Sequence, residues 1–158
     1  MELIRGLHNL KAHHHGCVAT IGNFDGVHLG HQHVLGELAE KAEEMKLPAV
    51  VITFEPQPQE FFIPDRCPGR LTRFREKIKA LRRLAVDRVF TLHFSQKLAA
   101  MEPEDFIQQV LVDGLGVRYL VVGDDFRFGQ KRRGSFEMLQ QAGQEHGFQV
   151  VNMHTFQL

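Results

Sequence analysis

Short runs of apolar, often β-branched residues alternate with amphipathic segments along the chain, and this alternation constrains the fold most. The runs "CVATIG" (17–22) and "AVVITF" (49–54) are typical of strands that are buried on both faces of a parallel sheet. Between them, apolar residues recur at helical spacing from residue 34 to residue 45, with charged residues on the opposite side. Strand, helix and strand therefore predict a right-handed βαβ unit over residues 17–54.

The same alternation continues along the rest of the chain. We expect helices over 72–84, 103–116 and 135–147, and strands over 88–94, 119–123 and 148–153. Thr72 is a candidate N-cap for the first of these helices, and Pro103 is suited to the first turn of the second. The pattern predicts a three-layer α/β fold of Rossmann-like type, with a mostly parallel five-stranded sheet and helices on both faces.

Length and composition favour one soluble domain over residues 1–158. Nineteen Lys and Arg balance nineteen Asp and Glu, so no overall positive field favours nucleic acid or a membrane surface as a partner. Cys17 and Cys67 are too few for a disulfide framework, and we expect reduced thiols in a cytoplasmic protein. No stretch approaches the roughly 20 apolar residues that span a bilayer.

Three polar loops rich in glycine or proline follow predicted strands, at 22–30, 55–58 and 123–134. In an open parallel sheet, ligands bind outside the carboxyl ends of the strands, where the strand order reverses. We therefore expect the three loops to converge on one binding site.

The first loop, "GNFDGVHLGH" (22–31), has the composition of an anion site. Its glycines, Gly22, Gly26 and Gly30, permit a close approach of the backbone to a ligand. The helix that follows directs free N–H groups and a partial positive charge to the same place. His28 and His31, three residues apart, fall on one face of its first turn, and each can donate to a phosphate oxygen.

Two other interpretations of this loop remain open. A glycine turn before a helix often carries a histidine with no role in binding. A zinc site is the more specific alternative to a phosphate site, because the chain also has His33 and the run His13, His14 and His15. Structural zinc sites mostly use thiolates, and catalytic zinc needs a third ligand at a defined spacing. The sequence shows neither feature.

The segment "GQKRRGS" (129–135) has the glycine spacing of a P-loop, but Ser135 occupies the position of its lysine. Its basic residues, Lys131, Arg132 and Arg133, can still reach a triphosphate. A solvated surface loop is the alternative interpretation.

Three blocks together resemble a known family. "GNFDGVHLGHQ" (22–32) resembles the HxGH signature of nucleotidylyltransferases, in the form found in the FMN adenylyltransferase (FAD synthetase) module of bacterial bifunctional riboflavin kinase/FMN adenylyltransferases. "TFEPQP" (53–58) and "VGDDFRFGQKRRG" (122–134) resemble the second and third blocks of that family, in the same order. The resemblance covers essentially the whole chain.

The resemblance implies that AMP is transferred from ATP to FMN, giving FAD and pyrophosphate with Mg²⁺. It implies catalytic roles for His28 and His31, which would bind triphosphate oxygens, and no protein-bound metal site. The residues it places at ATP are Gly22, Asn23, Phe24, Asp25, Gly30, Asp125, Arg127 and Arg132. Those it places at FMN are Phe54, Pro56 and Pro58.

Two departures from the family pattern are visible. Gln57 occupies a position where many members have histidine. The chain also ends at Leu158, before the family's "ISSTxxR"-like phosphate-binding segment and its riboflavin kinase domain, so we expect a truncated module. Alternatives are a nucleotide- or flavin-binding fragment without turnover, and an HxGH nucleotidylyltransferase that acts on another phosphate acceptor.

Overall fold

A computed structural model describes residues 1–22, 24, 29–55, 70–123 and 126–153. The strands are β1 (Glu2–Arg5), β2 (Cys17–Ile21), β3 (Ala49–Phe54), β4 (Arg88–Leu92), β5 (Val117–Val122) and β6 (Gln149–Asn152). The α-helices are α1 (Leu29–Met45), α3 (Arg70–Arg82), α4 (Gln96–Ala99), α5 (Pro103–Phe106) and α6 (Phe136–His146). The other helical segments are η1 (Leu7–Asn9), η2 (Ala12–His14), η4 (Ile107–Gly114) and η5 (Gln130–Arg132).

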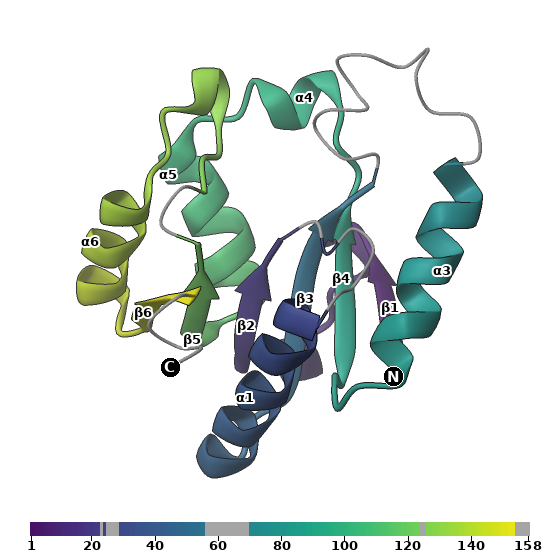
Figure 1. Cartoon of the computed structure of the whole chain (residues 1–158). Coiled ribbons are helices and arrows are strands. Elements are labelled where there is room, and N and C mark those ends of the chain that lie inside the picture. Colours follow the sequence, from purple (N-terminus) through teal and green to yellow (C-terminus); the bar gives the residue numbers. More distant parts are fainter. Residues whose placement is uncertain (23, 25–28, 56–69, 124–125, 154–158) are drawn as a thin grey trace.

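The six strands form one sheet in the order β1-β4-β3-β2-β5-β6, and every described pairing is parallel. From β2 the chain builds outward through β3 to β4, and it then returns to place β5 on the other side of β2. The strand order therefore reverses between β2 and β5 (Figure 1).

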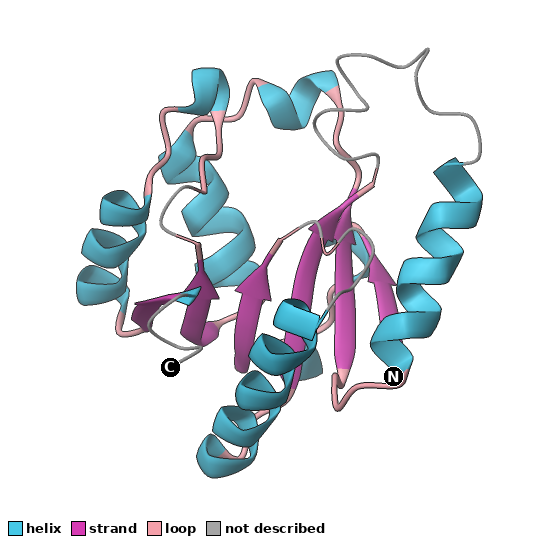
Figure 2. Cartoon of the chain, in the orientation of Figure 1, coloured by secondary structure: helices cyan, strands magenta, loops and turns pink. Residues whose placement is uncertain are grey.

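Helices cover both faces of the sheet, with α1 and α3 on one face and α5, η4 and α6 on the other (Figure 2). Alternate residues of each strand enter two separate cores: Val18 and Val51 pack under α1 and α3, whereas Ala19 and Ile52 pack under η4 and α6. All residues of β2 and β3 are buried for this reason, so the predominantly apolar sequences of these strands reflect burial on both faces.

Most of the predicted elements are confirmed. Ser135 caps α6 by accepting a hydrogen bond from the Met138 N–H, and Gly147 ends the helix in the left-handed conformation. Pro103 lies in the first turn of α5, which continues directly into the π-helical segment η4. The prediction that Thr72 caps a helix is wrong, because α3 already begins at Arg70.

The sheet has six strands rather than the predicted five. The additional strand is β1, which pairs in parallel with β4 at the edge of the sheet. Ile4 is the one buried residue of β1, and Leu3, which packs against the core on the other face, is only partly buried at this sheet edge. A strand with one buried side chain lacks the apolar run that marked the central strands.

Polar contacts attach β1 to its neighbours. The Lys11 N–H donates to Nδ1 of the buried His14 at 2.9 Å, so the proton of the neutral ring lies on Nε2, which donates to Glu2 Oε2 at 3.1 Å. Arg88 Nε lies 3.3 Å from the other carboxylate oxygen of Glu2. The hydrogen bond from His14 and the positive charge of Arg88 lower the pKa of Glu2 below its ordinary value of 4.5.

This network predicts a pH-dependent effect of Glu2→Gln on stability. Because the pKa of Glu2 is lower in the folded protein, its charge stabilises the fold above pH 4.5, and this contribution is lost as the pH falls through the folded-state pKa. We expect the variant to lower the Tm at pH 7 by about 1–3 °C, since an exposed pair contributes under about 1 kcal/mol.

Thermal unfolding followed by circular dichroism from pH 7 to pH 3 measures this difference, which should disappear at the acidic end. Glu44→Gln, which removes an exposed carboxylate paired with Lys41 on α1, is the matched control. A difference that stays constant over the whole range would contradict the assignment to the Glu2 charge.

Candidate functional site

The carboxyl ends of β2, β3, β4 and β5 lie along one edge of the sheet, because these strands are parallel. Ligands of open α/β sheets bind at this edge, at the point where the strand order reverses. Here that point lies between β2 and β5, and the predicted loops 22–30 and 123–134 follow these two strands. The topology therefore supports the expected convergence of these loops.

Gly22 follows β2, and its N–H donates to the Ile52 carbonyl of β3 at 3.1 Å. A Cβ atom at this position would lie 2.9 Å from the ring of Phe24, so only glycine fits without a shift of that ring. Phe24 has a left-handed backbone conformation, with φ of 50°, and is only 3% exposed. Burial of the ring compensates for the unfavourable backbone conformation.

The ring of Phe24 also packs against His31, in the first turns of α1. The two ring centroids lie 5.1 Å apart at an angle of 62°, an edge-to-face contact. His31 is half-buried, and Gly30 lies beside it in the first turn of the helix. Phe24 therefore lies in the core, where it can orient His31.

Phenylalanine rings gather beyond the ends of β3 and β4, on the face covered by α5 and η4. The phenylalanine cluster comprises Phe54, Phe94, Phe106, Phe126 and Phe128. The ring of Phe54 lies 6.0 Å from that of Phe94, and the rings of Phe126 and Phe128 are stacked at 5.7 Å. Phe94 and Phe126 are half-buried, so parts of these two rings remain accessible.

Sequence reasoning identified Phe54 but missed the other four members of the cluster. The available signal was the composition, because 13 of the 14 aromatic residues are Phe and one is Tyr. Composition does not say which rings meet, and this became visible only in the fold.

The loop over 126–134 is closed by an antiparallel bridge between Phe128 and Gly134. Gly129, with φ of 77°, lies against Pro103, which a Cβ atom would approach to 2.8 Å. Arg133 forms an ion pair with Glu102 and hydrogen-bonds to Gln130, so it ties the loop to the start of α5. Arg133 therefore fits the interpretation as part of a solvated surface loop. The exposed Arg127 and Arg132 remain candidates for contact with a triphosphate.

A buried lysine is a further polar feature of this edge that sequence reasoning missed. Lys77 lies among the apolar residues of α3, is 5% exposed, and its Nζ donates to Thr53 Oγ1 at 3.4 Å. Its position in an amphipathic helix that contains seven charged residues gave no sign of its burial.

Several predicted residues lie outside the described part of the chain. They are Asn23, Asp25, His28, Pro56, Gln57, Pro58, Cys67 and Asp125. Cys17 is buried, its Sγ donates to the Leu115 carbonyl at 3.6 Å, and burial raises the pKa of its thiol to about 12. Cys17 therefore has a packing role, as expected.

The two groups of histidines are separated by strand β2. His13, His14 and His15 precede the strand and His31 follows it, so about five residues of extended chain, or roughly 16 Å, lie between them. One zinc ion cannot bridge this distance. Glu2, His13 and His14 do place ligand atoms within 4.8 Å of one another, but both nitrogens of His14 already have hydrogen-bond partners.

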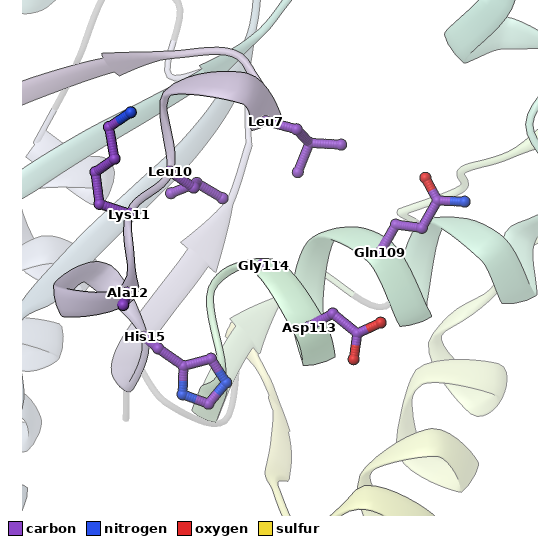
Figure 3. Close-up of a pocket in the computed structure, with 8 residues that line it drawn as sticks. All are labelled: Leu7, Leu10, Lys11, Ala12, His15, Gln109, Asp113 and Gly114. Carbon is purple, nitrogen blue, oxygen red and sulfur yellow. The ribbon is translucent and has the colours of Figure 1, made fainter.

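A pocket of about 650 Å³ lies between the segments that lead into β2 and into β5 (Figure 3). Its lining residues are Leu7, Leu10, Lys11, Ala12, His15, Gln109, Asp113 and Gly114. None of the predicted site residues lines it.

The relatives of the chain agree with the resemblance inferred from its motifs. The FAD synthetase family profile matches residues 10–158. The chain is 52% identical over its whole length to a bifunctional riboflavin kinase/FMN adenylyltransferase of Pseudomonas fluorescens, and 50% identical over 99% of its length to the protein of that name from Escherichia coli K12. It spans 50% of the length of each of these relatives.

A solved structure described as a macrolide-efflux protein from Streptococcus pneumoniae matches with a TM-score of 0.72 and 23% identity. The match covers 96% of this chain and 50% of that chain, and at this identity it supports the fold alone. Together with the family match over 10–158, the sequence relatives show that the chain belongs to the FAD synthetase family.

Proposed function

We propose that the chain transfers AMP from ATP to the phosphate of FMN, giving FAD and pyrophosphate, as a step of flavin cofactor synthesis. The observation that carries the proposal is the arrangement at one sheet edge of His31 at the start of α1 and the phenylalanine cluster beyond β3 and β4. The first feature suits a polyphosphate, and the second suits a flat aromatic ring system.

In this reaction a phosphate oxygen of FMN attacks the α-phosphorus of ATP. A new P–O bond forms, the bond to the bridging oxygen breaks, and pyrophosphate leaves with the electron pair. The attacking oxygen is already anionic, so the protein has to position the substrates and stabilise charge rather than remove a proton. ATP enters as its magnesium complex, and the ion shares the task of charge neutralisation.

Within this proposal, His31 donates to phosphate oxygens of ATP from the first turns of α1, and His28 acts beside it. The positive end of the α1 dipole favours the same negative charge. Phe24 orients the His31 ring rather than binding ATP itself, because it is buried against that ring. The further residues proposed at ATP are Gly22, Asn23, Asp25, Gly30, Asp125, Arg127 and Arg132, and those proposed at FMN are Phe54, Pro56 and Pro58.

The names of the relatives support a second part of the proposal. They are called bifunctional, and this chain matches half of their length. We infer that a riboflavin kinase domain accompanies this module in the whole protein and supplies its FMN. None of the described helices is long and apolar enough to cross a membrane. A cytoplasmic location belongs to the same proposal.

The direct test is to incubate the chain with Mg-ATP and FMN and to separate the flavins by chromatography. FAD formation supports the proposal. Transfer of AMP to a different phosphate ester, with no FAD, would indicate another acceptor. Binding of ATP and FMN without any product would favour the binding-fragment alternative.

Replacing His31 by alanine should lower the rate of FAD formation on the order of 10²-fold, since the variant loses a hydrogen-bond donor to charge that develops in the transition state. The matched control is His33→Ala, because His33 is exposed on the same helix and outside the proposed contacts. Equal rates for both variants would show that the His31 imidazole is structural.

Replacing Phe126 by leucine should weaken FMN binding by about two- to tenfold, because aromatic pairs contribute about 0.5–1.5 kcal/mol beyond burial of area. ATP binding should remain unchanged. Quenching of flavin fluorescence measures the first affinity, and Phe136→Leu is the control, since Phe136 is half-buried on α6 outside the phenylalanine cluster. A loss of ATP affinity with normal FMN affinity would refute this flavin assignment.

A further inference from the structure

Among the α3 side chains that the structure describes, those of residues 74–82, the inward face carries one charged group among apolar ones. Phe74, Ile78 and Leu81 pack on the sheet, and Lys77 lies on the same stripe, with an exposed fraction of only 5%. Lysine is seldom buried to this extent, because transfer of an ammonium group from water into a protein interior is costly. The Lys77 ammonium group has polar contacts inside the fold, and the hydroxyl of Thr53 is one of them.

Lys77 lies next to a layer of three buried threonines near the carboxyl ends of three strands, and we call it the polar layer. Thr20, Thr53 and Thr91 are each the last residue but one of β2, β3 and β4, and all three are buried on the face that α1 and α3 cover. Lys77 Nζ donates to Thr53 Oγ1 at 3.4 Å. The register aligns Thr53 with Thr91, whose buried hydroxyl has no hydrogen-bond partner in the part of the chain that the structure describes.

This layer lies directly beside the features proposed to bind substrates. His31, on α1, shares the sheet face of Lys77 and contacts the same core through Phe24. The phenylalanine cluster lies on the other face, and its member Phe54 is the next residue after Thr53. A flavin whose rings contact the cluster would therefore extend its ribityl chain across the strand ends, toward the face of Lys77 and His31.

We propose that the ammonium group of Lys77, held by Thr53 at the end of β3, recognises the phosphate of the flavin substrate. This inference rests on the proposed function. The phosphate of FMN and the triphosphate of ATP must approach each other although both are negatively charged. A cation in a site of low dielectric constant reduces this repulsion more than an exposed cation would. It also distinguishes FMN from riboflavin, which lacks the phosphate.

The test compares the affinities for FMN and riboflavin, both by flavin fluorescence, in the wild-type chain and in two variants. Lys77→Gln and Lys79→Gln each remove one positive charge from α3, but Lys79 is exposed. We expect Lys77→Gln to weaken FMN binding on the order of tenfold, since a hydrogen bond to a charged group contributes about 1.5–3 kcal/mol. Riboflavin binding should stay within about twofold, and Lys79→Gln should change neither affinity.

Equal weakening of FMN and riboflavin, or no weakening of either, would overturn the proposal and leave Lys77 with a structural role. A selective loss of ATP affinity would overturn it too. Lys77→Met provides a second variant, because an apolar side chain of similar length occupies the same space among Phe74, Ile78 and Leu81 without the charge. Its selectivity for FMN over riboflavin should fall as in Lys77→Gln.

FMN binding and FAD formation by the wild-type chain distinguish a failure of this inference from a failure of the proposed function. If it neither binds FMN nor forms FAD, the proposed function fails and the inference fails with it. If it does both, and Lys77→Gln still binds FMN normally, only the inference about Lys77 fails.

Discussion

The position of β2 between β3 and β5 is the constraint on which the candidate site depends. The chain builds the sheet outward from β2 in one direction and then in the other, so the loops after β2 and β5 leave the sheet at adjacent points. Helices on both faces bury the two central strands completely, which fixes their register. The carboxyl edge of this sheet therefore holds the start of α1 next to the strand ends that carry the phenylalanine cluster.

Local strain at this edge is compensated by packing. Phe24 adopts a left-handed backbone conformation that is uncommon for a residue other than glycine, and its ring is almost fully buried. The buried ring fills the space beside Gly22 and touches His31. This contact orients the His31 ring at the start of α1 without a ligand, and such preorganisation suits the proposed stabilisation of phosphate charge.

Sequence reasoning predicted the central strands because burial on both faces leaves predominantly apolar runs, as in residues 49–54, and it predicted the main helices from apolar residues at helical spacing. It missed β1, where one buried side chain gives no periodic signal. It proposed His31 and Phe54 as site residues from local motifs, because motif residues are neighbours in sequence. The contacts of Phe94 with Phe54 and of Lys77 with Thr53 join segments far apart in the chain, so only the folded arrangement reveals them.

The central claim is that both substrates bind along the carboxyl edge of the sheet, with the flavin on one face of its strands and the phosphates toward the other. Backbone amide NMR spectra recorded during titration with FMN, and then with a magnesium complex of a non-hydrolysable ATP analogue, test this claim most directly. The account predicts that the amide signals of Gly22, His31 and Phe126 shift, while those of His15 and Gly114, which precede β2 and β5, stay in place. Shifts confined to the residues around His15 and Gly114 would contradict it.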